Sequence, residues 1–238
     1  MIKHKSLIIS ILLILCLGIF AYFLSSLVLG NKVLNAINEQ GPAITQTDLS
    51  AQSAFISPVT GKGAIRGLHL KNPEGYESAH ALWCAKVHVS LSWPSLFGSG
   101  PVEVNQVRFT NPTLAFEKTI RSSNFNEIYN NISEPEPMPE DATHFTLASL
   151  MMEKGHVATR IGDRAVLLQM PSSSKSDLDG ELTPEAFTRE MLNALMRNIG
   201  AAKAEASQQI RQNGLGSVNA INGSLEDVFG ELNRSSEP

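Results

Sequence analysis

The chain has 238 residues, of which 42% are hydrophobic and 18% charged, proportions typical of a folded protein. Its formal net charge is −4, and the only charged side chains among the first 30 residues are two lysines, so the remainder is more acidic still. This balance excludes a nucleic-acid-binding surface as the main function, because such surfaces are basic.

The first predicted element is a membrane-spanning helix at residues 7–29. This run carries no charge and is dominated by Leu and Ile, and about 20 apolar residues span a bilayer core as a helix. Lys3 and Lys5 precede it, so the positive-inside rule places the N-terminus in the cytoplasm and the rest outside. The run is longer than the apolar core of a signal peptide. We therefore assign residues 1–30 to a cytoplasmic stub and an uncleaved anchor.

Residues 31–60 are expected to connect this anchor to a folded domain. The helical pattern continues through residues 31–40, and Gly41 and Pro42 are expected to end it. Residues 45–56 are polar with spaced apolar side chains, which makes them a candidate first strand.

Residues 61–132 form the first predicted sheet block. Within strand 64–71, a bulge at Gly67 would turn Ile65, Leu68 and Leu70 to one face. An Asn-Pro-x-Gly turn follows at residues 72–75.

Residues 79–93 show the clearest pattern in the chain. Apolar side chains occupy seven successive odd positions, which predicts a strand with one buried and one largely polar face. The candidate lipid-facing or core residues on this odd face are Trp83, Val87, Val89, Leu91 and Trp93.

The block ends with a bent strand or strand pair at residues 102–117, interrupted at Pro112, and a helix at residues 124–131. Asn124 is the expected N-cap of that helix, with Glu127 reaching back to it.

An acidic, Pro-rich linker at residues 133–143 separates this block from a second one at residues 144–200. Strands at 144–150, 155–160 and 165–170 predict a three-stranded meander, and Thr183 starts an amphipathic helix. The apolar stripe of this helix either packs on the sheet or faces a partner or the membrane; it comprises Phe187, Met191, Leu195 and Ile199. Residues 201–238 are predicted to be a polar helical or disordered tail.

No catalytic motif, cofactor loop or metal site is predicted, so we expect a non-enzymatic protein. His80, Cys84 and His88 share one strand face, but neighbours four apart on a strand are about 13 Å apart, too far for one ion. Cys16 lies in the membrane segment and cannot pair with Cys84 in the sheet.

The order of these features resembles the AsmA-like family of inner-membrane-anchored envelope proteins over about residues 1–200. The resemblance is carried by GKGAIRGLHLKNPEGY at 61–76, the strand ending in Ser95-Leu96, and the strand 104–116 containing Asn111-Pro112. The helix begun by Ser123-Asn124-Phe125 and the meander followed by Leu182-Thr183-Pro184-Glu185 add to it. It implies a bacterial inner-membrane protein with its bulk in the periplasm, whose curved sheet forms an apolar groove for phospholipid.

The predicted fold is therefore α+β: one transmembrane helix, then a curved, mostly antiparallel and groove-like sheet with a few amphipathic covering helices. Two functions are compatible with it. The apolar sheet face could hold or help move phospholipid in support of envelope biogenesis. Alternatively, helices could seal this face into the core of a membrane-tethered module that binds an envelope protein partner. The alternation of apolar and polar residues along the strands is the same for both functions, so it does not distinguish them.

Overall fold

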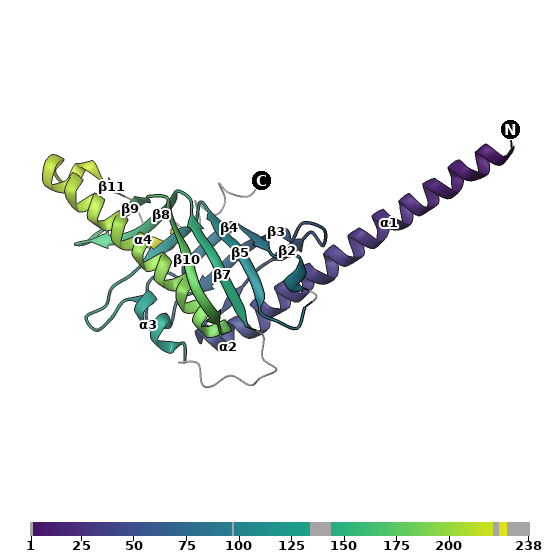
Figure 1. Ribbon diagram of the computed structural model, residues 1–238. Helices are drawn as coiled ribbons and strands as arrows, with labels where there is room; N and C mark the ends of the chain where they lie inside the picture. The colour runs from purple at the N-terminus through teal and green to yellow at the C-terminus, as the bar shows by residue number, and fades with distance from the viewer. Residues whose placement is uncertain (1, 97, 134–143, 221–223, 228–238) are drawn as a thin grey trace.

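The computed structural model describes residues 2–96, 98–133, 144–220 and 224–227 (Figure 1). It is an α+β structure in which a long N-terminal helix leads into a mixed sheet with helices against one face. Apart from residue 133, the predicted linker lies outside the described residues, and so does most of the predicted tail beyond residue 220.

The N-terminal helix is longer than predicted. Helix α1 (Ile2–Asn35) continues through a π-helical turn (Ala36–Gln40) into α2 (Gly41–Thr45), so Gly41 and Pro42 do not end it. The predicted stop is wrong because the wider π-turn accommodates Pro42, which sits in the first turn of α2, where its missing N–H is not needed. Over Ile14–Thr45 this helical segment is long and apolar enough to cross a membrane.

Eleven strands form one sheet, in which most pairs are antiparallel and the pairs β5–β7 and β6–β8 are parallel. The single candidate strand predicted at residues 45–56 is two short strands, which pair with β3 at one edge. The strands are β1 (Leu49–Ser50), β2 (Ser53–Ile56), β3 (Lys62–Lys71), β4 (His80–Leu91), β5 (Val102–Thr110), β6 (Thr113–Phe116), β7 (Phe145–Met152), β8 (Gly155–Ile161), β9 (Arg164–Met170), β10 (Ser173–Leu182) and β11 (Asn219–Ala220).

Strands β5 and β6 are two halves of one long strand. Lys86 of β4 faces Thr110 and Leu82 faces Leu114, so both halves pair with the same edge of β4 in an unbroken register. Strand β3 occupies the other edge of β4. The interruption at residues 111–112 is the bend that the sequence predicts at Pro112.

The second block is one long hairpin. Strands β7 and β8 run parallel to β5 and β6 with the same offset of 43 residues, because Phe145 lies opposite Val102 and His156 lies opposite Thr113. Strands β9 and β10 return antiparallel along β8 and β7. The predicted three-stranded meander is therefore wrong, because β8 continues β7 instead of pairing with it.

Irregular backbone positions lie at one level across the sheet, and two of these positions have left-handed backbone. Gly67 in β3 has φ of 61° and Asn111 between β5 and β6 has φ of 49°. Glycine and asparagine tolerate this conformation better than other residues. At the same level, residues 153–154 separate β7 from β8 and residues 171–172 separate β9 from β10.

This row of irregular residues changes which side chains point inward. The register of β3 against β4 is the same on both sides of Gly67, so no extra residue is inserted there. The left-handed backbone nevertheless interrupts the strict alternation, and Ile65, Leu68 and Leu70 all line the same cavity. In β4 the inward residues change from Leu82 before this level to Val87 after it.

Two helices, α3 (Asn124–Asn131) and α4 (Pro184–Asn213), cover the inward face. The boundary predicted at residue 200 falls inside α4, which passes through Gly200 without ending. On the opposite face, Leu225 is fully buried against Ala158 and Ala165. Part of the predicted tail is therefore helix, and another part packs on the sheet.

The N-cap of α3 is Ser123, whose hydroxyl accepts a hydrogen bond from the Asn126 N–H. Asn124, the predicted cap, is buried, and its side-chain amide donates to Asn72 and to the carbonyl of Ala115. It therefore ties the helix to the turn after β3, while Ser123 performs the capping.

Helix α1 covers the free edge of β2. A side chain at Gly30 would collide with the backbone carbonyl oxygen of Ala54, so only glycine permits this approach. Nearer the N-terminus of the same helix, the Tyr22 hydroxyl donates to the Ser57 hydroxyl at 3.2 Å. A helix over an edge strand protects the sheet from pairing with other chains.

Candidate functional site

An apolar cavity of about 310 Å³ lies between the sheet and the helices. Three parts of the chain enclose it: the segment from α1 to α2, the inward face of β3, β4 and β5, and the first half of α4. Its volume is at the lower end of the range for small-molecule sites in proteins. The polar side chains among its described lining residues are Gln40, Thr45 and Thr188.

The sheet wall contains six of the eight strand residues that the sequence predicts for this face. Ile65, Leu68, Leu70 and Val87 are each at most 9% exposed. Val89 and Leu91 are half-buried and lie further along the cavity.

The two tryptophans do not belong to this wall. Trp83 is half-buried and its strand neighbour Leu82 lines the cavity instead. Between Cys84 and Val87, the inward-facing side chains of β4 change from even-numbered to odd-numbered positions. Alternation counted back from the end of β4 therefore assigns Trp83 to the wrong face. Trp93 lies beyond the end of β4 and is 40% exposed.

The helix wall is made by the apolar stripe of α4. Phe187, Met191 and Leu195 line the cavity, and the ring of Phe187 lies 5.5 Å from that of Phe145. Ile199 is only 2% exposed and belongs to the core beyond the cavity. The stripe therefore faces the sheet, and the interpretation that it faces a partner or the membrane is wrong.

The third wall comes from the N-terminal helix, which sequence analysis treats as a connection only. Val33, Ile37 and Ile44 line the cavity from this side. Their helical spacing is visible in the sequence, but nothing in it shows that the helix folds back over the sheet. Strand β5 also contributes, and its bulge at Asn105 keeps Val104 and Val107 on the same face.

The cavity offers contact with hydrocarbon and little else. The hydroxyl of Thr45 donates to the Gly41 carbonyl at 2.8 Å, and that of Thr188 donates to the Pro184 carbonyl at 2.8 Å. Both hydroxyls are thus engaged within their own helices and are not directed at a substrate. Apolar burial is the interaction that this site can supply.

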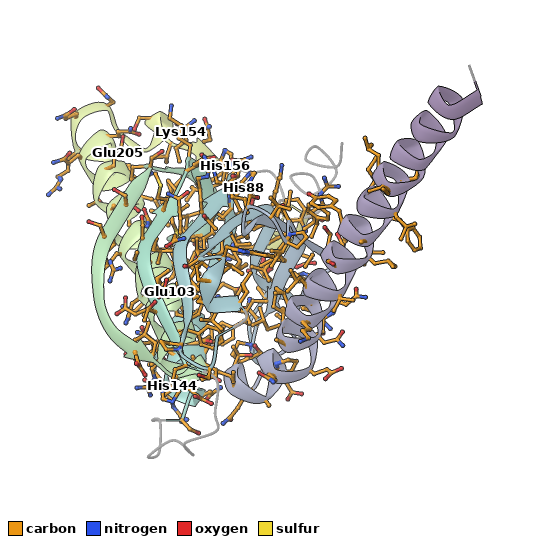
Figure 2. All side chains as sticks on the ribbon, turned by 45° about the vertical axis from the view of Figure 1, so that its right-hand side comes forward. His88, Glu103, His144, Lys154, His156 and Glu205 are labelled. Carbon is orange, nitrogen blue, oxygen red and sulfur yellow. The ribbon has the colours of Figure 1, made fainter. Side chains whose placement is uncertain are left out.

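The titratable side chains of the sheet do not form a reactive cluster. Cys84 points inward and His88 to the other face, and burial raises the pKa of the Cys84 thiol to about 11. Figure 2 shows His144 far from His88 and His156. Among the residues that the structure describes, no group of three His, Cys, Asp or Glu side chains is placed to hold a metal ion.

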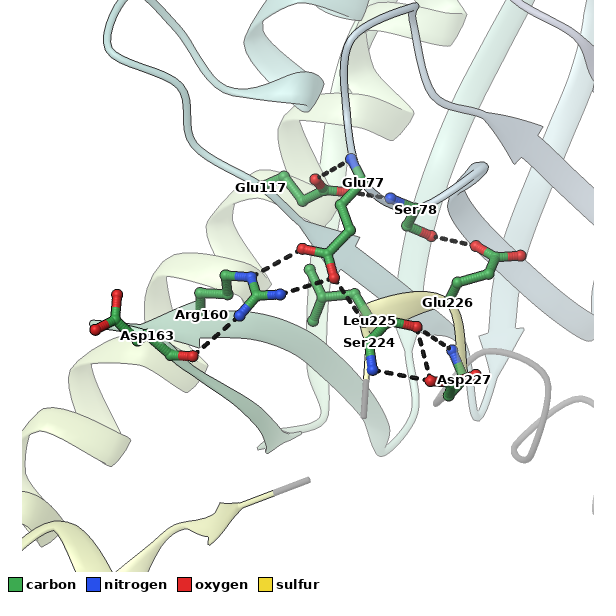
Figure 3. A network of polar contacts seen from close by, with 9 residues as sticks. All are labelled: Glu77, Ser78, Glu117, Arg160, Asp163, Ser224, Leu225, Glu226 and Asp227. Carbon is green, nitrogen blue, oxygen red and sulfur yellow. Dashed lines mark hydrogen bonds and ion pairs between the residues drawn. The ribbon is translucent and has the colours of Figure 1, made fainter. Parts of the chain in front are cut away.

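A network of carboxylates surrounds the turn that follows β3 (Figure 3). Arg160 donates to both carboxylate oxygens of Glu77 at 2.8 Å, and the Leu225 N–H donates to the same group at 3.2 Å. The Arg160 guanidinium holds the pKa of Glu77 below its ordinary value. Glu117 accepts from the backbone N–H groups of Glu77 and Ser78. These contacts fix the turn that follows β3 and the segment at residues 224–227, which is a structural role.

Comparison with known protein families and with curated proteins found no match for this chain.

Proposed function

We propose that this protein is a membrane-anchored envelope protein of the AsmA-like kind, without enzymatic activity, that holds a hydrocarbon chain of a phospholipid in its apolar cavity. The observation that carries the proposal is the composition of the cavity: it is apolar on all sides, and one wall is the continuation of the helix that is suited to span a membrane. A lipid held there lies beside the bilayer from which it came.

In this proposal, α1 anchors the protein in the bacterial inner membrane. The positive-inside rule supports an orientation with Lys3 and Lys5 on the cytoplasmic side and the sheet domain in the periplasm. The proposal also takes the row of irregular residues to bend the sheet around the cavity, so that the inward face serves as a groove.

The size of the cavity favours a ligand over a sealed core. Protein interiors are packed as densely as organic crystals, with few voids larger than a water molecule. Large apolar cavities do not hold water but bind apolar molecules. Each methylene group buried from water contributes about 0.8 kcal/mol, so part of one acyl chain is enough for stable retention.

The alternative is a membrane-tethered module that binds an envelope protein partner. One observation favours it: beyond the cavity, α3 and α4 already seal the inward face, with Phe125, Ile128 and Ile199 at most 2% exposed. In this case the cavity is a packing defect and retains no ligand.

Two tryptophan substitutions on the same strand distinguish these functions. Val89→Trp fills the cavity, whereas His88→Trp places the same side chain on the opposite face and serves as the matched control. The measurement is native mass spectrometry of the full chain released from detergent micelles after washing away loosely bound lipid. Retention of one phospholipid by the wild type and by His88→Trp, but not by Val89→Trp, supports the proposal. Equal retention by both variants, or none by the wild type, contradicts it.

A further inference from the structure

The sheet domain begins to contact the N-terminal helix before the helix has crossed a full bilayer. Helix residues from Tyr22 onward pack on β2, since Tyr22 binds Ser57, Ser26 is only 1% exposed and Gly30 meets Ala54. A helix rises about 1.5 Å per residue, so Tyr22 lies about 22 Å from Leu7, the first residue of the apolar run. The hydrocarbon core of a bilayer is about 30 Å thick.

This geometry has a direct consequence for the loop that carries Ser57. If the span starts at Leu7, Tyr22 lies about 8 Å below the outer boundary of the hydrocarbon core, so its hydroxyl and Ser57 lie in the outermost part of that core. A tilted helix would bring them deeper still, because tilt shortens the distance that the helix travels along the membrane normal. The part of the domain around Ser57 must therefore enter the interfacial layer.

The side chains around Ser57 are suited to that layer. Outside α1, four large hydrophobic side chains of the described residues are exposed, and three of them lie at this end of the molecule. Phe55 is 46% exposed, Val59 is 67% exposed and Trp93 is 40% exposed. The loops carrying Val59 and Trp93 are joined at their bases by a hydrogen bond from the Leu91 N–H to the Gly61 carbonyl at 2.9 Å.

The charge pattern points the same way. Neither the loop at residues 57–61 nor the loop at residues 92–101 contains a charged residue. The loops at the opposite ends of the same strands are rich in charge, as in the network around Glu77 and Arg160 (Figure 3). Burying a charge in a membrane interface is costly, whereas tryptophan is enriched there.

We infer that Phe55, Val59 and Trp93 form a seating surface that inserts into the outer interfacial layer of the membrane that α1 crosses. This inference rests on the proposed anchoring by α1. It deepens the proposed function, because seating keeps the cavity wall formed by Val33 and Ile37 within a few helical turns of the bilayer surface. Lipid then enters without crossing a water-filled gap.

Depth-dependent quenching tests the seating surface on the full chain. In a Cys16→Ser background, single cysteines replace Val59, Ile120 or Leu15 and are labelled with an environment-sensitive fluorophore. Cys84 is fully buried, so the background protein should take up no label. Ile120 is the matched control, because it is also an exposed apolar loop residue but lies at the other end of the sheet. Leu15, exposed on α1, reports on anchoring.

The labelled proteins are placed in phosphatidylcholine–phosphatidylglycerol vesicles containing a spin-labelled phospholipid quencher. We expect strong quenching and a blue-shifted emission at positions 15 and 59, at least twofold more than at position 120. Quenching at position 15 with equal, weak quenching at 59 and 120 overturns the seating surface while leaving the anchor intact. Weak quenching at position 15 overturns the anchoring and the seating surface together.

Discussion

A single glycine decides how the N-terminal helix meets the sheet. Gly30 lies against the backbone carbonyl of Ala54, whereas Gly18 of the same helix has nothing within 4 Å of the position where a Cβ would stand. Backbone cannot move aside as a side-chain tip can, so any added atom at position 30 must push α1 away from β2. The contact between Tyr22 and Ser57 depends on the same approach.

We therefore expect Gly30→Ala to destabilise the full chain by about 1–3 kcal/mol, the usual cost of overpacking. Gly18→Ala should cause no loss, because it adds a methyl group in open space and favours the helix. Thermal unfolding in detergent, followed by tryptophan fluorescence, measures both. Equal melting temperatures for the two variants would show that the helix does not depend on this contact.

Sequence reasoning works for side chains whose environment is set by local pattern and fails for those set by backbone geometry. The alternation of β4 correctly assigns Val87 to the inward side but assigns Trp83 there as well. The change of facing near Cys84 lies at the level of Gly67 in the neighbouring strand, which a period-two count within β4 does not include. Asn124 is misassigned for a similar reason, because its partner Asn72 is distant in sequence.

At the scale of the elements, the row of irregular residues interrupts the sheet at one level. Asn111 has left-handed backbone with φ of 49° between β5 and β6, and it is exposed. A β-branched residue is strained in this region, whereas glycine is not. The substitution therefore tests the backbone without disturbing the core.

We expect Asn111→Val to destabilise the chain by about 1–3 kcal/mol relative to Asn111→Gly, the typical cost of such backbone strain. Chemical denaturation of both variants at pH 7.5 measures the difference. Identical midpoints would mean that the backbone at residue 111 relaxes freely, and the bend would then have another cause.

The short chain segment at residues 224–227 is held by Glu77 together with Glu226, which accepts from the Ser78 hydroxyl and the Ala79 N–H. The Glu77 carboxylate accepts from Arg160 and from the Leu225 N–H (Figure 3). Glu77→Gln removes the charge that both donors share, and hydrogen bonds to charged groups are the stronger ones.

Amide exchange in residues 224–227 should accelerate several-fold in Glu77→Gln, because a weaker contact lets this segment open more often. Glu74→Gln, at an exposed acid in the same turn, should leave the exchange rate unchanged. Hydrogen exchange followed by mass spectrometry provides the measurement. Equal rates in the two variants would assign the docking to the burial of Leu225 and the contacts of Glu226.

At the scale of the whole molecule, local elements were predictable and their connection was not. Period-two patterns locate most strands, because alternation is a property of adjacent residues, but they miss β10 and β11. They cannot show that β8 continues β7. That continuity follows from the pairing of β7 with β5 and of β8 with β6 at the same residue offset. The cavity is missed in part for the same reason: the wall formed by Val33 and Ile37 exists only because α1 folds back over the sheet.

Two half-buried histidines make the stability of the whole molecule depend on pH. Burial lowers the pKa of His80 and of His156, and the Nδ1 atom of His156 is buried without a hydrogen-bond partner among the described residues. For His80, the nearby Glu226 partly offsets the effect of burial. Their folded-state pKa values are thus below the ordinary value of about 6.5 that holds in the unfolded chain.

Below about pH 6.5 the unfolded chain binds more protons than the folded one, so the free energy of unfolding falls as the pH is lowered from 7.5 to 5.5. At lower pH the depressed pKa of Glu77 adds a further loss. Urea denaturation of the full chain across this range measures the slope. Because leucine does not titrate, His156→Leu should flatten the slope between pH 6.5 and 5.5, and His80→Leu should do so less. A stability that is constant or rises on acidification would show that both imidazoles are protonated without cost in the folded protein, which would require water to reach them inside the sheet.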